Sequence, residues 1–526
     1  MRGEINIDSI RALDEQIKEL EEALTKLKRT RNSLLNAHRL PPEILGKVFQ
    51  HNIMPESDFG GLDKRSHNFL FVCHHWSEVA SHTPELWGFW GNTTRDWLRW
   101  YSRSAIAPLD LILTGADRDC YFDRALFDEL QDRASRDIVR RVHLRSGDSQ
   151  LLNSVLSSLT SECEDIRSDQ MESLILRNLD DVPVDVSNFF VHHYFPKLQR
   201  LNLTHCKISS WDLLRSRTGA LTELYLDFIE PSLTPPTSQL LSILASNPSL
   251  RKVTLLHQAV PQDSANTSPF RAPLRHLRQL ILSGESRHVF GLLQRLVHRA
   301  TLDKLAVTLP NCKASEVSQI IGPYLRRHLQ RRGRPPSGIG LSLPHSGNHI
   351  VFNVGEGGRI HLGSVWMDKA VTLSLKLGQS PPKRVLEKAA LDLMTYVPRE
   401  DITHFWGISG PVGMGDIYTR LPNLKMLCLY EIHLPAVFPE PNSSGNGDVP
   451  PSLQALVLPR LKVEGGNWTP LTTFLAYRAS NGKQLNTLQI SSDYHIRSKV
   501  VESIEGMVQK FSLKRVRLLC SSGIRS

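Results

Sequence analysis

The side chains that most often carry catalysis or bind metals are scattered along this chain. Its cysteines are odd in number, 7 in all, and no two of them form a C-x-x-C pair. A disulfide framework needs paired cysteines and a zinc cluster needs closely spaced ligands, so the pattern predicts reduced thiols in an intracellular protein. Cys206 ends a leucine-rich phrase, and we interpret it as a small buried residue rather than a nucleophile.

Two histidine pairs, His74–His75 and His192–His193, resemble a metal motif more than any other residues do. Adjacent residues on a helix or strand point apart, so neither pair is predicted to bind a metal. The glycines of GPVGMG, at positions 410–415, lack the spacing and context of a dinucleotide loop. The sequence has no P-loop, G-x-S-x-G or H-E-x-x-H motif. We therefore predict a non-enzyme that needs neither metal nor cofactor.

Composition and charge are those of an ordinary globular protein. The 526 residues are 40% hydrophobic and 22% charged, with a formal net charge of +10. The excess of positive charge is mild, and the basic residues do not form the concentrated stripe that would favour nucleic acid as a partner. The densest basic run could be a nuclear signal, a phosphate-binding patch or, as we favour, a solvated helix end; it comprises Arg326, Arg327, Arg331, Arg332 and Arg334. With neither a signal peptide nor a membrane span of about 18 apolar residues, we expect a cytoplasmic or nuclear protein without membrane contact.

The first forty residues contain none of these chemical motifs, but their apolar side chains are regularly spaced. Residues 8–37 carry apolar side chains at alternating spacings of three and four, with Arg31 at one core position: Ile10, Leu13, Ile17, Leu20, Leu24, Leu27 and Leu34. A seam that repeats every 3.5 residues is what a coiled coil buries. The helix is predicted either to lie on its own protein or to associate with a partner or a second copy.

Residues 38–92 read as a small helical module. Pro41 and Pro42 end one helix and start the next, because proline fits a first helical turn but not a helix interior. A second amphipathic helix is expected from Phe69 to Val79, and Thr83-Pro84 begins a third element. So many large apolar side chains cannot all be hidden within about 50 residues, which predicts a partner surface.

The motifs of this segment carry a family resemblance. L-P-P-E-I-L-x-x-V-F, then V-C-x-x-W-x-x-V-A, then T-P-x-L-W is similar to the F-box-like domain of mushroom-forming fungi. In that family the domain docks on a Skp-type adaptor, and through it on a cullin. The resemblance implies adaptor contacts for Leu40, Pro41, Pro42, Ile44, Leu45, Val48 and Phe49, with Cys73, Trp76, Leu86 and Trp87 completing the helical core or its rim. His74 and His75 depart from the family, which often has arginines there.

Beyond residue 105 the chain repeats a phrase of an apolar residue, another three later and another two after that. Leu198-x-x-Leu201-x-Leu203-x-x-Cys206 is its fullest form, and the phrases start about 23 to 32 residues apart. Residues two apart share a strand face, so each phrase predicts a short strand whose last two members point inward. Helical stretches such as Ser238–Ala245 and His288–His298 lie between the phrases. The pattern is typical of an irregular leucine-rich repeat, with a looser α/β packing of the same strands as the alternative.

The rhythm is interrupted near residues 308–420. Strands are still expected at Ile339–Leu343, Ile350–Val354 and Val371–Leu375, and Pro435–Pro451 is expected to be a surface loop. The predicted fold is thus mixed: a coiled-coil-like helix at 8–37, a three-helix F-box-like domain at 38–92, and a leucine-rich-repeat-like α/β solenoid at 105–526.

The resulting functional hypothesis is a substrate receptor of a Skp–cullin–F-box ubiquitin ligase. The F-box-like domain would dock on the adaptor, and the repeats would hold an unidentified target protein. A repeat-based interaction scaffold outside any ligase is the alternative.

Overall fold

The computed structural model describes residues 7–53, 68–91, 107–115, 128, 130–131, 138–160, 166–262, 271–298, 302–309, 314–331, 336–342, 349–356, 360–361, 364–365, 368–377, 383–408, 420–430, 450–459, 461, 463, 467–492 and 498–515. The chain forms two compact units, Met1–Leu221 and Thr222–Ser526. The boundaries expected at 37/38 and between 92 and 105 both fall inside the first unit.

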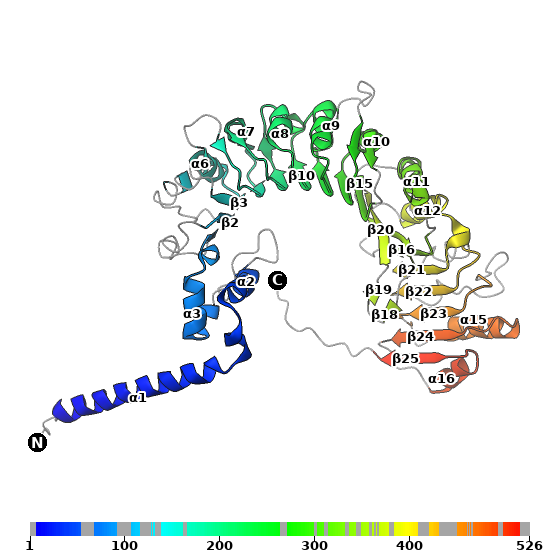
Figure 1. Ribbon diagram of the computed structural model, residues 1–526. Coiled ribbons are helices and arrows are strands. Elements are labelled where there is room, and N and C mark those ends of the chain that lie inside the picture. Colours follow the sequence, from blue (N-terminus) through cyan, green and yellow to red (C-terminus); the bar gives the residue numbers. More distant parts are fainter. Residues whose placement is uncertain are drawn as a thin grey trace, which may run out of the picture. The chain divides into compact units, whose positions relative to one another are not determined.

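A long helix opens the first unit, and short helical pieces follow it (Figure 1). The long helix is α1, Ile7–Ser33, so it ends before the predicted residue 37. The module that follows consists of η1 (Asn36–Arg39), α2 (Pro42–Ile53), η2 (Asn68–Phe71), α3 (His74–Ser81) and η3 (Pro84–Leu86). Pro42 occupies the first position of α2, and the carbonyl of Pro41 accepts hydrogen bonds from the next turn, as expected for proline at a helix start.

Two details of the module differ from prediction. The expected helix from Phe69 to Val79 is broken at Cys73, whose backbone is extended. The break turns Phe69 into the core and leaves Val72 exposed, whereas a continuous helix would place both on one face. The third element is a single 3-10 turn, η3, rather than an α-helix.

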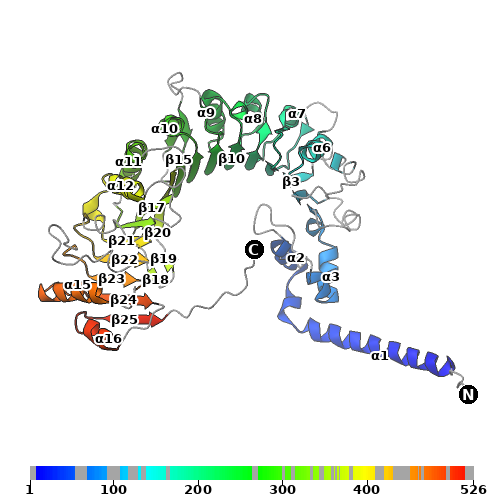
Figure 2. The same ribbon diagram turned by 180° about the vertical axis from the view of Figure 1, so that it is seen from behind.

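A parallel sheet fills the rest of the first unit. Its strands lie in the order β1 (Phe89–Gly91), β2 (Leu109–Gly115), β3 (Val139–Ser146), β5 (Ser173–Asn178) and β8 (Arg200–Thr204), every neighbouring pair parallel. Helices α6 (Ser149–Leu159), α7 (Ser187–His192) and α8 (Asp212–Arg217) cover one face of the sheet (Figures 1 and 2). Short strands β4 (Ile166–Arg167), β6 (Val184–Asp185), β7 (His193–Tyr194) and β9 (Cys206–Lys207) pair with one another outside it.

The second unit continues the alternation of strand and helix. Its strands pair in the order β10 (Glu223–Phe228), β11 (Lys252–His257), β13 (Gln279–Ser283), β15 (Lys304–Leu309), β20 (Asp368–Leu377), β17 (His349–Glu356), β16 (Gly338–Ser342), β21 (His404–Ile408), β22 (Met426–Tyr430), β23 (Ala455–Leu458), β24 (Thr487–Ser492) and β25 (Phe511–Arg515). Its α-helices are α9 (Thr237–Ser246), α10 (Ser286–Arg295), α11 (Ala314–Arg331), α12 (Lys383–Met394), α15 (Thr469–Ser480) and α16 (Ser498–Glu505).

The interruption near 308–420 has a structural counterpart in this sheet. Strand β17 runs antiparallel to both of its neighbours, β16 and β20, and every other neighbouring pair in the second unit's sheet is parallel. The meander β16–β17–β20 reverses the chain order, so that β20 rather than β16 pairs with β15. All three strands expected in this region are present, and they join the same sheet as the phrases around them.

The repeated phrases supply the cores of both units. In the phrases from Val139 to Ile490, the last two members lie on strands, and they are 0% to 3% exposed. Cys206, which closes the fullest phrase, is also buried. The predicted mixed fold with N-terminal helices and parallel strands is therefore confirmed. Residues 410–415 lie outside the described residues, as do most of Pro435–Pro451 and the last two members of the final phrase.

Candidate partner-binding surfaces

Helix α2 presents an apolar stripe to solvent. Ile44 and Val48 are one helical turn apart on α2, which places them on one face of the helix. Leu40 has an extended backbone and lies just before the helix, and the three residues are 37%, 44% and 42% exposed in chain order. Pro41 and Pro42 are exposed at the start of the same helix. We call Leu40, Ile44 and Val48 the α2 stripe. It is available to a partner without any rearrangement of the module.

The opposite side of α2 forms the core of the module. Leu45 and Phe49 are 1% and 0% exposed, and the ring of Phe49 stacks on Phe69 at 4.5 Å between centroids. Trp76 packs against the same ring at 5.2 Å. The indole nitrogen of Trp87 donates a hydrogen bond to the carbonyl oxygen of Ala80 at 2.8 Å, which satisfies its one polar group in the core.

The structure therefore divides the predicted adaptor contacts into three groups. Leu40, Pro41, Pro42, Ile44 and Val48 are exposed, and Cys73 and Trp76 are half-buried. Leu45, Phe49, Leu86 and Trp87 are buried core residues and present no side chain to a partner. Consecutive helical residues are about 100° apart, so a broad apolar face on α2 divides between the core and solvent. Adaptor docking itself stays a prediction, now restricted to the exposed group.

Histidine and cysteine side chains meet at the rim of the module. Nε2 of His38 lies 3.2 Å from Sγ of Cys73, and its ring centroid is 4.6 Å from that of His75. Burial lowers the pKa of His38, and the neighbouring His75 lowers that pKa further. His74 points to solvent beside Glu78, 3.7 Å away. His74 and His75 therefore have different surroundings, and of the two only His75 packs against the module.

The helical module packs directly against the sheet of the first unit. Strand β1 directly follows the module and pairs in parallel with β2. The amide of Asp110 donates to the carbonyl of Gly88 at 2.7 Å. The side chain of Ile112, on β2, is buried in the same cluster as Leu45 and Phe49. The module and the first strands thus share a core, which fixes the α2 stripe relative to the sheet of the first unit.

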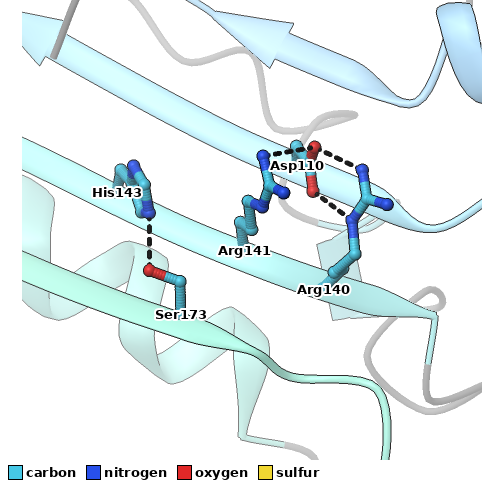
Figure 3. A network of polar contacts seen from close by, with 5 residues as sticks. All are labelled: Asp110, Arg140, Arg141, His143 and Ser173. Carbon is cyan, nitrogen blue, oxygen red and sulfur yellow. Dashed lines mark hydrogen bonds and ion pairs between the residues drawn. The ribbon is translucent and has the colours of Figure 1, made fainter. Parts of the chain in front are cut away.

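A second candidate surface is the face of this sheet that is turned away from α6, α7 and α8. Side chains alternate along a strand, so the polar residues between the buried leucines lie on this face. Figure 3 shows Asp110 between two arginines of β3 and His143 reaching toward Ser173. Asp110 accepts from Arg140 at 2.9 and 2.6 Å, and Arg141 lies 3.7 Å away. The hydrogen bond to Asp110 raises the pKa of Arg140.

Arginines continue along this face beyond the network. Arg145 on β3 stands directly opposite Arg177 on β5 in the strand register. Two like charges are thereby placed side by side on neighbouring strands, where they repel one another. Sequence reasoning missed both the Asp110 network and this arginine pair. The available signal was the basic residues at the variable positions of the phrase Val139–Leu144.

Two cysteines, Cys206 and Cys428, are buried. Burial raises the pKa of the Cys206 thiol to about 12, and it does the same for Cys428. A thiol with so high a pKa is a poor nucleophile at neutral pH. Among the described residues, no group of three or more His, Cys, Asp or Glu side chains is placed to hold a metal ion. None of the described helices has the length and apolar character needed to span a membrane.

Comparisons with known proteins add little to this picture. No family model matches the sequence, and no curated protein matches it. A solved structure with some likeness is an internalin from Listeria monocytogenes, with 13% sequence identity and a TM-score of 0.25. The match covers 72% of this chain and 82% of that chain. A likeness at this level carries no argument about function.

Proposed function

We propose that this chain is a substrate-receptor subunit of a Skp–cullin–F-box ubiquitin ligase. The observation that carries the proposal is the α2 stripe, an exposed apolar line on a module whose motifs resemble the F-box-like domain. Apolar side chains aligned on a helix, above a packed core, suit docking into a partner's apolar groove. The chain would supply proximity rather than chemistry.

The two surfaces serve the two partners that this function requires. The α2 stripe would bind a Skp-type adaptor. The sheet face that is turned away from α6, α7 and α8, with Arg145 and Arg177, would bind the target. On this proposal the parallel strands belong to an irregular leucine-rich-repeat-like solenoid. The shared core at Ile112 supports the proposal, because a receptor must hold its target at a fixed distance from the adaptor.

Adaptor binding is the direct test, and the variants follow from burial. Ile44→Asp with Val48→Asp places charges on the α2 stripe without entering the core. We expect at least about tenfold weaker binding to a Skp-type adaptor in a pull-down with the full chain. The matched control is Leu179→Asp with Val182→Asp, two residues exposed by 50% and 60% outside the module. Absence of adaptor binding by the native chain would refute the ligase proposal.

A repeat-based scaffold outside any ligase is the second candidate, favoured by the same sheet face, on which Arg145 is exposed and Arg177 is half-buried. It predicts that no cullin co-purifies with the adaptor and that a bound protein is not turned over. Affinity purification with mass spectrometry separates the two functions. Arg145→Glu with Arg177→Glu should remove bound targets and leave adaptor recovery unchanged, because these arginines lie on the sheet and not on the module.

A further inference from the structure

Helix α1 has an apolar seam that the described part of the chain leaves uncovered. Its seam residues, which are between 46% and 70% exposed, are Ile10, Leu13, Ile17, Leu20, Leu24 and Leu27. The helix is continuous over 27 residues, or about 40 Å. A water-exposed seam of this length on a regular helix is what a second helix covers in a coiled coil.

The charges of α1 are segregated along its length. From Ile7 to Glu22 the helix has six acidic and two basic residues, and from Ala23 to Ser33 it has four basic residues and no acidic one. The first half therefore carries a net charge of minus four, and the second half carries plus four. In a parallel pair, like halves would lie side by side and repel. In an antiparallel pair, each acidic half lies beside a basic half.

We propose that two copies of this chain associate through an antiparallel coiled coil of their α1 helices. The occupant of the seam is a second copy because α1 is complementary to itself when reversed. This proposal goes beyond ubiquitin-ligase function and does not rest on it.

The register follows from the seam. Centring the pair near Glu22 places Ile17 opposite Leu27 and Leu20 opposite Leu24, in layers that are apolar on both helices. Arg31, at a seam position, then faces Leu13, whose surface its long aliphatic stem can cover. A parallel pair would instead place Arg31 against its own copy in the same layer.

Residues that flank the seam provide a second criterion. In the antiparallel register Asp14 lies beside Lys28 of the other copy, and symmetry makes this attractive pair occur twice. One repulsive contact between the two copies of Glu21 lies at the centre. In a parallel pair, by contrast, the flanking neighbours of Asp14 and Lys28 are Ser9 and Ala23, which are uncharged.

Cysteine cross-linking of the full chain distinguishes the two orientations. We expect a disulfide-linked dimer when Ile17→Cys is mixed with Leu27→Cys, and none with Ile17→Cys alone. In the antiparallel pair the two copies of position 17 are about 15 Å apart along the axis, beyond the reach of a disulfide. The native chain, with its own cysteines, is the control. Cross-linking of Ile17→Cys to itself would indicate a parallel pair and overturn the proposal.

Charge reversal tests the register in solution. Lys28→Glu should weaken the dimer about tenfold, because two attractive pairs become repulsive, and Asp14→Lys with Lys28→Glu should restore it. Lys26→Glu makes the same charge change on the outer side of the helix and should weaken the dimer less than about threefold. Light scattering during size-exclusion chromatography gives the populations. A native chain that remains monomeric at high micromolar concentration would also overturn the proposal.

Discussion

The division of α2 into a core side and a partner side makes a quantitative prediction. Phe49 is fully buried against Phe69 and Trp76, so Phe49→Ala removes a large side chain from the centre of the module. Such truncations cost about 3–5 kcal/mol. Ile44 is 44% exposed, so Ile44→Ala should cost about 0.5 kcal/mol.

Local opening of the module reports this difference directly. Native-state amide hydrogen exchange, followed by mass spectrometry on peptides from α2 and α3, measures the free energy of opening for that region. Phe49→Ala should accelerate exchange there by about two to four orders of magnitude, and Ile44→Ala by less than about threefold. Equal acceleration by the two substitutions would refute the assignment of Phe49 to the core and Ile44 to the surface.

Three further substitutions test other parts of the first unit. Gly88→Ala should loosen the junction of module and sheet, because a Cβ at Gly88 would overlap the carbonyl oxygen of Pro108; faster hydrogen exchange in β1 and β2 is the expected result, and Gly219→Ala, in open space, is its control. Asp110→Ala should lower the free energy of unfolding by about 3 kcal/mol in urea titrations, because it leaves two partly buried arginines without their carboxylate. His193→Gln should remove a pH dependence of stability between pH 6.5 and about 4.

The sign of that pH dependence follows from burial. Burial lowers the pKa of His193 from 6.5 to about 4, with further lowering by His192 and Arg217 and an opposing hydrogen bond with the backbone of Leu159. Below pH 6.5 the unfolded chain binds a proton at His193 that the folded chain does not bind. Stability therefore falls as the pH is lowered through this window, by up to about 3 kcal/mol. An unchanged stability profile in His193→Gln would contradict this account.

Each of the other two predictions also has an outcome that would contradict it. Asp303 forms an exposed pair with Arg278, so Asp303→Ala should cost less than about 0.5 kcal/mol. A loss for Asp110→Ala no larger than for Asp303→Ala would mean that the Asp110 network contributes little to stability. For Gly88→Ala, exchange in β1 and β2 no faster than in Gly219→Ala would show that the junction tolerates a side chain.

Some features followed from the sequence because their signals are local. The phrase that ends in Leu201 and Leu203 has a period of two, and α1 has a heptad seam, so each pattern predicted its element and its buried or apolar side. Pro42 likewise marked the start of α2. Such signals depend on backbone geometry over a few residues, which any fold must respect.

Other features depended on contacts between residues far apart in the chain. Which of Ile44 and Leu45 enters the core was set by Phe69 and Ile112, and the sequence pattern contains neither contact. The pairing of β20 with β15, in place of β16, likewise has no local signal.

The sequence by itself therefore determined the repeated strands, helix α1 and the start of α2, together with the apolar side of each. Only the tertiary structure decided which apolar side chains are buried and which remain for a partner. The physical reason is that periodicity reports the geometry of one element, whereas burial depends on what packs against it.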